Sequence, residues 1–209
     1  IKKGEVLIQN GDTRFKNHKI DPNEMATIIF TSGTTSMSKA VMLSNNNIAS
    51  NIYDMHMVET FCSTDVNMAF LPFHHTFGST GLLVFLSAGA TNVFCDGLRH
   101  IQENLREYKV TAFVCVPLLL EAMYKKIMAE VERQGKTKLI KIATKVSNFL
   151  LKFKIDIRRK LFKSVLEPLG GKLRFIVSGA SAIDKKVAQF WNISSTRIWA
   201  NRMFSGISG

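Results

Sequence analysis

Residues 26–43 read ATIIFTSGTTSMSKAVML, and this stretch decides the expected fold. Residues 26–30 form an apolar run typical of a buried strand, and residues 40–43 form a second short apolar run. The loop between them, residues 31–39, holds hydroxyl side chains, one glycine and one lysine. Glycine permits a tight turn, while hydroxyl groups, backbone N–H groups and a lysine bind phosphate oxygens. A strand followed by such a loop indicates a phosphate site, although a Ser/Thr-rich surface turn has the same pattern.

Short apolar runs alternate with helical patterns on the carboxyl side of this loop. Strands are expected at residues 66–71, 91–95, 110–116 and 173–177. Helices are expected at residues 44–57, 76–86, 101–108, 118–131 and 183–190. Repeated strand–helix alternation predicts an α/β fold with a layered, largely parallel sheet flanked by helices. Residues 1–22 are polar, and we expect them to lead in from an upstream region outside this sequence.

The composition of the 209 residues favours a packed domain in a reducing compartment. Hydrophobic residues make up 46% of the chain and only 4 residues are proline, so a packed core is expected. No uninterrupted run of about 18 apolar residues is present, which disfavours a transmembrane helix. Cys62, Cys95 and Cys115 are odd in number and far apart, which argues against a disulfide scaffold or a zinc site. We therefore expect a cytoplasmic protein.

The net charge of +12 is concentrated in one segment. Between residues 125 and 163, thirteen Lys and Arg residues face three acidic residues, so this segment carries nearly all of the excess. Within it, apolar residues recur every three or four positions, as in an amphipathic helix. They are Leu139, Ile142, Val146, Phe149, Leu150, Phe153, Ile157 and Leu161. We expect the opposite side to carry Lys138, Lys141, Lys145, Lys152, Arg159 and Lys163, and we expect a basic helical insert over residues 124–166.

Three interpretations of this basic segment differ in what its two faces contact. The favoured one is a solvated basic face over a buried apolar face. The second is peripheral contact with anionic lipid at the inner face of a membrane. Nucleic acid comes third, because no helix-turn-helix, RNP-like or zinc-finger pattern is present, and we expect no nucleic-acid partner.

The loop at residues 31–39 closely resembles the phosphate loop of the AMP-forming adenylating enzymes, usually Thr-Ser-Gly-Thr-Thr-Gly-x-Pro-Lys-Gly. Here Ser36, Ser38 and Ala40 replace the second Gly, the Pro and the third Gly. Lys39 is not preceded by glycine, which excludes a Walker A loop. The resemblance implies that ATP is bound by Thr31, Ser32, Gly33, Thr34, Thr35 and Lys39. It also implies that Thr31 lies on the metal side and that Lys39 is catalytic.

Two further segments resemble motifs of the same family. Residues 71–78, LPFHHTFG, are similar to Leu-Pro-x-x-His-x-Phe, which implies that His75 lines the acyl pocket and positions the carboxylate. For His74 and His75 an incidental place at a strand end is the alternative. Residues 178–183, SGASAI, resemble the adenine loop Ser-Gly-Ala-Ala-Pro-Leu, although a generic strand-to-helix turn uses small residues too. The resemblance assigns adenine binding to Ser178, Gly179, Ala180 and Ser181.

The order of the three motifs implies a partial adenylation (AMP-binding) domain over residues 23–190. The resemblance is greatest to bacterial long-chain fatty-acid–CoA ligases, which implies a fatty acid, ATP, Mg²⁺ and coenzyme A as co-substrate. Two alternatives remain open. One is an adenylating enzyme for an aryl or amino acid, and the other is a non-catalytic nucleotide-binding or membrane-associating module.

Residues 191–209 depart from the family pattern, which continues with Gly-Tyr-Gly-x-Thr-Glu. Read one nucleotide later, the codons for residues 190–208 can spell a sequence that contains Gly-Tyr-Gly-Leu-Thr-Glu. Trp191 and Trp199 then become glycines, because the Trp codon is followed by A or G in each case. We therefore expect a frameshifted tail. Since the family's Mg²⁺-binding glutamate belongs to this motif, we also expect the chain to lack ligase activity.

Overall fold

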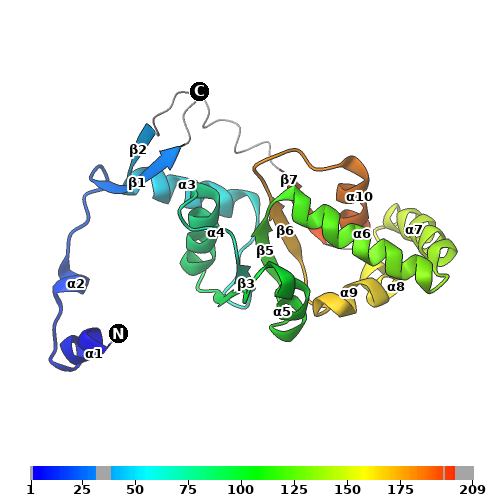
Figure 1. The fold of residues 1–209 in the computed structure, drawn as a ribbon, viewed down its shortest axis with the longest axis horizontal. Helices are drawn as coiled ribbons and strands as arrows, with labels where there is room; N and C mark the ends of the chain where they lie inside the picture. Colours follow the sequence, from blue (N-terminus) through cyan, green and yellow to red (C-terminus); the bar gives the residue numbers. More distant parts are fainter. Residues whose placement is uncertain (1, 32–38, 195, 201–209) are drawn as a thin grey trace. The chain divides into compact units, whose positions relative to one another are not determined.

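β1 (Met25–Thr31) and β2 (Lys39–Ser44) form an antiparallel two-stranded sheet on either side of the expected phosphate loop. The computed structural model describes residues 2–31, 39–194 and 196–200, and it divides into units 1–54 and 55–209 (Figure 1). The first unit also holds α1 (Lys2–Gln9) and α2 (Arg14–Asn17), whose described residues are exposed. α3 (Asn45–Val58) begins in the first unit and ends in the second.

The expectation of a buried strand at residues 26–30 is wrong. β1 and β2 pair with each other alone, and most of their side chains are exposed in the described part of the chain. Phe30 and Met42, for example, are 68% and 70% exposed. An apolar run shows that a strand forms, but it does not identify the layer that covers the strand.

The second unit contains a five-stranded parallel sheet in the order β4-β3-β5-β6-β7. Its strands are β3 (Val66–Ala69), β4 (Thr91–Phe94), β5 (Ala112–Cys115), β6 (Phe175–Ser178) and β7 (Arg197–Ala200). Parallel neighbours need crossover connections, which the helices between them supply. The predicted α/β fold with a largely parallel sheet is therefore confirmed.

Helices and two short 3₁₀ turns join these strands (Figure 1). They are α4 (Thr76–Ser87), η1 (Leu98–His100), α5 (Ile101–Glu107), α6 (Pro117–Arg133), α7 (Thr137–Leu151), α8 (Arg158–Leu161), α9 (Lys163–Leu166), η2 (Glu167–Leu169) and α10 (Lys185–Ile193). Those expected from the sequence agree with the observed bounds to within a few residues. The basic segment divides into the end of α6 and the separate helices α7, α8 and α9.

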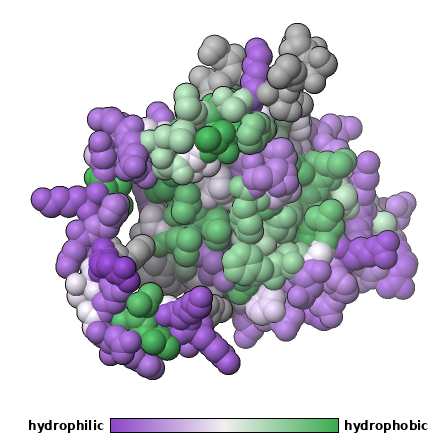
Figure 2. All heavy atoms as spheres, turned by 60° about the vertical axis from the view of Figure 1, so that its left-hand side comes forward, coloured by the Kyte–Doolittle hydropathy of each residue, from purple (hydrophilic) through white to green (hydrophobic). Residues whose placement is uncertain are grey.

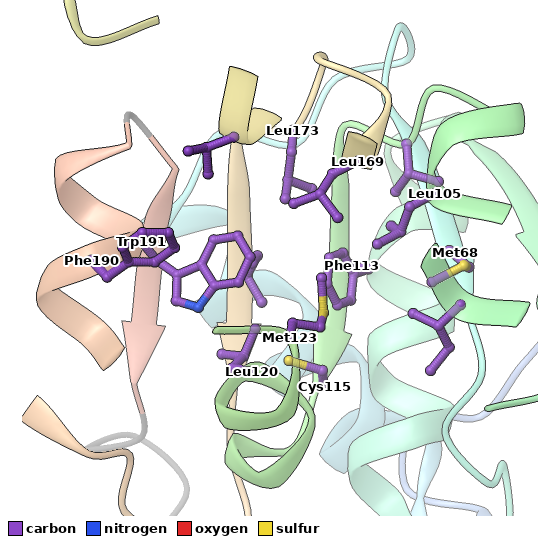
Figure 3. Packing of buried hydrophobic residues seen from close by; sticks show 14 of the residues in the cluster. Met68, Leu105, Phe113, Cys115, Leu120, Met123, Leu169, Leu173, Phe190 and Trp191 are labelled. Atoms are coloured by element: carbon purple, nitrogen blue, oxygen red, sulfur yellow. The ribbon is translucent and has the colours of Figure 1, made fainter. Parts of the chain in front are cut away.

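β5 and β6, two of the three inner strands, are buried on both faces. On one face Phe113, Cys115 and Ile176 pack with residues of α5, α6, α9 and α10, including Trp191 (Figure 3). On the other face Phe175 packs with α4, where its ring lies 6.3 Å from that of Phe85. This double coverage explains why both strands read as continuous apolar runs.

A buried ionic cluster joins the amino ends of β3, β5 and β6. The Asp65 carboxylate accepts hydrogen bonds from Thr111 Oγ1 at 2.6 Å and from Arg174 Nη2 at 2.6 Å. Burial opposes ionisation of Asp65, but the hydrogen bonds from Arg174, Thr111 and the Cys62 N–H lower its pKa below the ordinary value. Asp65 is 2% exposed, so this cluster fixes three strands from inside the protein.

α7 presents an apolar stripe to solvent, which corrects the favoured interpretation of the basic segment. Leu139, Ile142 and Phe149 are between 58% and 62% exposed. The side of α7 that packs on the protein instead carries Ile140 and Ala143, which contact the core cluster. Apolar residues therefore cover more than half of the helix circumference. Periodicity locates the apolar side but does not say which part of it the protein covers.

The segment expected to be frameshifted contributes its first residues to this fold. Trp191 is fully buried, and Arg197 of β7 donates a hydrogen bond to the buried Glu59 carboxylate at 3.1 Å. Residues 201–209 lie outside the described residues. The frameshift stays a prediction that the coding DNA would test.

Three further features concern the surface, the cysteines and the helices. Figure 2 shows hydrophobic residues at the surface bordered by hydrophilic ones. All three cysteines are free thiols, and burial raises the pKa of the Cys115 thiol. None of the helices in residues 2–31, 39–194 and 196–200 has the length and hydrophobicity that crossing a bilayer requires.

Candidate functional site

The two ends of the expected phosphate loop lie opposite each other. Thr31 and Lys39 are paired in the β1–β2 ladder, and Thr31 Oγ1 donates a long hydrogen bond of 3.5 Å to the Lys39 carbonyl oxygen. Both residues are exposed. Ser32, Gly33, Thr34 and Thr35 lie outside the described residues. The antiparallel ladder thus holds Thr31 and Lys39 at the mouth of the loop.

His75 lies directly before α4, in the segment that follows β3. Its carbonyl oxygen accepts hydrogen bonds from the backbone N–H groups of Gly78 and Ser79, both at 3.1 Å. The His75 side chain is exposed, and its ring centroid lies 4.3 Å from that of His74. The backbone therefore fixes the start of α4 and leaves the imidazole free of any capping role.

The expected adenine loop begins at the carboxyl end of β6. Ser178 is buried, and its Oγ has no hydrogen-bond partner among the described residues. The Gly179 N–H donates to the Cys115 carbonyl oxygen at 3.1 Å, which continues the β5–β6 ladder by one step. Ala180 then has φ +73°, a left-handed conformation that is rare for residues with a Cβ. Such backbone strain gathers at ligand-binding loops. Ala180 and Ser181 are exposed.

Phe77 brings the second and third motifs into contact. A methyl group at Gly179 would lie 2.6 Å from Cζ of Phe77, so the aromatic ring packs directly on the glycine backbone. Phe77 is the phenylalanine of the segment that is similar to Leu-Pro-x-x-His-x-Phe, but the motif alone does not indicate its contact with Gly179. The glycine and the aromatic ring meet because β3, β5 and β6 are parallel neighbours and the segments after them leave the same edge.

This edge is the place where an open α/β sheet binds ligands. From β3 the chain forms β4 on one side and then returns to form β5 on the other side of β3. Ligands of such sheets bind outside the carboxyl ends of the strands, at the point where the strand order reverses. The segment that carries His75 follows β3, and Gly179 follows β6.

A small cavity under this edge has about 10 Å³ of space, enough for one water molecule at most. Gly81 and Val114 close it, since a methyl group at Gly81 would lie 2.9 Å from Val114 Cγ2. No acyl pocket is therefore open at this point of the described chain. The larger groove of the second unit, about 900 Å³, lies between the second half of α6, α7 and the α8–α9 segment.

The described residues do not form a magnesium site by themselves. Mg²⁺ is held by carboxylate and phosphate oxygens, and Thr31 contributes one hydroxyl group. No group of three His, Cys, Asp or Glu side chains able to hold a metal exists in the part of the chain that the structure describes.

The expected site residues thus fall into two groups. Thr31 and Lys39 belong to the first unit, while His75 and residues 178–181 belong to the second. The structure brings the segments of the second group together through Phe77 and Gly179. The roles of the individual residues stay predictions.

Comparison with known proteins gives relatives in one family. Human long-chain-fatty-acid–CoA ligase 1 is 32% identical over 180 residues, which is 81% of this chain and 26% of that protein. Long-chain-fatty-acid–CoA ligase 5 of Rattus norvegicus is 30% identical over 181 residues, which is 82% of this chain and 26% of that protein. The chain therefore spans about a quarter of the length of these curated relatives.

Solved structures share the fold. The adenylation domain of a carboxylate reductase from Mycobacterium chelonae superposes with a TM-score of 0.66 at 22% identity, over 86% of this chain and 26% of that chain. A malonyl-CoA ligase in complex with methylmalonyl-CoA and AMP superposes with a TM-score of 0.61 at 18% identity, over 86% of this chain and 33% of that chain. The AMP-binding enzyme family matches residues 2–201, and the chain belongs to this family.

Proposed function

We propose that this chain is part of an AMP-forming fatty-acid–CoA ligase. A fatty-acid carboxylate attacks the α-phosphorus of ATP, which releases pyrophosphate and forms an acyl-adenylate. The coenzyme A thiolate then attacks the acyl carbon and releases AMP. The match to the AMP-binding family and the long-chain ligases among the relatives support this proposal.

The observation that carries the proposal is the contact between Phe77 and Gly179 at the carboxyl edge of the sheet. It joins the segment with His75 to the loop of residues 178–181, where an open α/β sheet binds its ligand. In this assignment residues 178–181 contact adenine and His75 faces the carboxylate. The proposal assigns phosphate binding to Ser32, Gly33, Thr34 and Thr35, a hydroxyl group to Thr31 and a positive charge to Lys39.

We further propose that the 209-residue polypeptide binds ATP without turning it over. Residues 190–209 contain no acidic side chain, so they do not supply the carboxylate that the family uses for Mg²⁺. Fatty-acid-dependent pyrophosphate release by the purified chain, lost in Lys39→Ala, would contradict this. Coding DNA whose second frame lacks Gly-Tyr-Gly-Leu-Thr-Glu would contradict the frameshift.

The direct test of nucleotide binding is calorimetric titration with ATP, with GTP as the competing base. We expect ATP to bind more tightly than GTP because the proposal assigns residues 178–181 to adenine recognition. Lys39→Ala should weaken ATP binding about tenfold or more, since a hydrogen bond to a charged group contributes roughly 1.5–3 kcal/mol. Lys19→Ala is the matched control, because Lys19 is exposed in the same unit.

Two finer assignments belong to the same proposal. We place the protein in the cytoplasm, in keeping with its three free cysteines. An aryl or amino acid is the alternative substrate, and comparison of pyrophosphate release by a full-length protein with palmitate, benzoate and amino acids separates the two. Equal ATP and GTP affinity would instead favour a general phosphate-binding module.

A further inference from the structure

α7 carries an apolar stripe that no described part of the protein covers. Its members are spaced by three or four residues, so they lie along one side of the helix. The stripe continues past the end of α7 through Phe153. Its residues are Leu139, Ile142, Val146, Phe149 and Phe153, which are 42–63% exposed. The rings of Phe149 and Phe153 lie 5.3 Å apart in an edge-to-face arrangement, so the stripe ends in an aromatic pair.

A groove extends the stripe toward α6. It has a volume of about 900 Å³ and is lined largely by apolar side chains. Leu139, Ile142 and Val146 belong to both the stripe and the groove. In Figure 1, α7 lies next to α6 and α8, beyond the sheet. The unit thus exposes a continuous apolar surface that is far larger than one side chain.

Positive charge borders this surface on one side of α7. Helical spacing puts lysines 138, 141, 145 and 152 next to the stripe rather than opposite it, which corrects the expectation from the sequence, and all four are exposed. None of them forms an ion pair with another described residue. Residues 133–155 contain no aspartate or glutamate, so the charge of α7 is uncompensated along its length.

The groove side is also basic on balance. Lys126 and Lys136 line it, whereas Arg133 donates to the Glu130 carboxylate at 2.7 Å. The hydrogen bonds from Arg133 and Gln134 lower the pKa of Glu130 to about 2, so the Arg133–Glu130 pair is neutral overall at physiological pH. The lysines therefore give this surface a positive net charge.

We propose that the apolar stripe of α7 and its groove dock on an anionic lipid bilayer. The helix lies parallel to the membrane, the stripe enters the headgroup–acyl boundary, and the lysines reach the phosphate groups. Charge complementarity selects this occupant. Residues 133–155 carry lysines and no acidic residue, so they attract an anionic lipid surface, whereas a second copy of this chain would bring the same positive charge. The inference does not depend on the proposed ligase activity.

The test is co-sedimentation of the 209-residue chain with vesicles of phosphatidylcholine alone or mixed with phosphatidylserine. We expect binding to the mixed vesicles only, with a loss at high salt because screening weakens surface electrostatics. Replacing lysines 138, 141, 145 and 152 by glutamine should weaken binding on the order of a thousandfold. Lys185→Gln with Lys186→Gln is the matched control on the exposed face of α10.

A second set of experiments tests whether the apolar stripe of α7 enters the membrane. Phe149→Trp places an indole in the stripe. Its fluorescence emission should shift to the blue with the vesicles that contain phosphatidylserine and not with those of phosphatidylcholine alone. Phe149→Ser with Phe153→Ser should abolish sedimentation, while Leu98→Ser, at a residue 74% exposed outside the stripe, should not. Circular dichroism of each variant shows that it is folded.

Three results would overturn the proposal. The first is equal binding to neutral and anionic vesicles, and the second is no blue shift in folded Phe149→Trp. The third is sedimentation-velocity evidence for a dimer that Phe149→Ser with Phe153→Ser dissolves, because the stripe would then belong to a second copy.

Discussion

α10 and α7 are amphipathic helices of similar pattern with opposite surroundings. Val187, Phe190 and Trp191 of α10 are buried against the sheet, whereas Leu139, Ile142 and Phe149 of α7 are exposed beside lysines. α10 begins with an Asp184 side chain that caps two backbone N–H groups and packs on β7, while α7 packs on α6 and α8. An apolar face therefore stabilises the fold only where a second layer covers it. Where nothing covers it, the same pattern leaves a surface for binding.

Among the substitutions that test this comparison, Trp191→Ala should change the free energy of unfolding most. The residue is fully buried, and its ring lies 5.5 Å from that of Phe190. Trp191→Ala should lower the free energy of unfolding by about 3–5 kcal/mol, because it removes buried surface and leaves a cavity. Urea denaturation followed by circular dichroism measures this. An effect below about 1 kcal/mol would mean that α10 is not held as described.

The next effect is expected at Asp65. Asp65→Asn should cost about 3 kcal/mol of unfolding free energy, at the lower end for a broken buried pair because Arg174 is one-third exposed. The pKa of Asp65 is lowered in the folded state, so its contribution is present above the unfolded pKa of about 3.9. It is lost as the pH falls through the folded pKa. The difference in unfolding free energy between parent and variant should therefore be constant from pH 7 to about pH 4 and narrow below about pH 4, and a difference that stays constant to pH 3 would contradict the assignment.

A smaller effect is expected at Gly179. Gly179→Ala places a methyl group 2.6 Å from the Phe77 ring, which must move. We expect a loss of about 1–3 kcal/mol in unfolding free energy and weaker ATP binding, measured by denaturation and calorimetry. Gly4→Ala is the control, since its methyl group would have no neighbour within 4 Å. A second substitution, Phe77→Ala, should relieve the strain, and failure to do so would rule out the Phe77–Gly179 contact.

The smallest effect is expected on the α7 side of the comparison. Phe149→Ser changes an exposed side chain, so the unfolding free energy should change by no more than about 0.5 kcal/mol. Urea denaturation of this variant beside Trp191→Ala sharpens the contrast between the two helices. A loss of 2 kcal/mol or more, on the order of a core truncation, would show that the stripe is covered in solution.

The sequence predicts β3 to β6 and most helices of the second unit, but not β7, which lies in the stretch expected to be a frameshifted tail. β5 and β6 are short apolar runs closed by Pro117 and Gly179, and their length and boundaries are typical of buried parallel strands. The pairing of β1 with β2 and their exposure are not predictable in this way. A local pattern does not name its partner strand or covering layer.

The candidate site, too, can be predicted from the sequence only in part. The motifs place His75 and residues 178–181 in segments that follow strands, which the structure confirms. The contact of Phe77 with Gly179 depends on the order β3-β5-β6, and that order is set by tertiary packing. The sequence also does not predict which side of α7 is exposed, because apolar residues cover more than half of the helix circumference.

Hydrogen–deuterium exchange of the 209-residue chain with and without ATP tests the central assignment most directly. The proposed site predicts that ATP slows exchange of amides in residues 31–39, 75–79 and 178–181 and leaves α7 unchanged. ATP-dependent protection confined to the lysine-rich α7, with none at residues 75–79 or 178–181, would contradict the assignment of the nucleotide site to the carboxyl edge of the sheet.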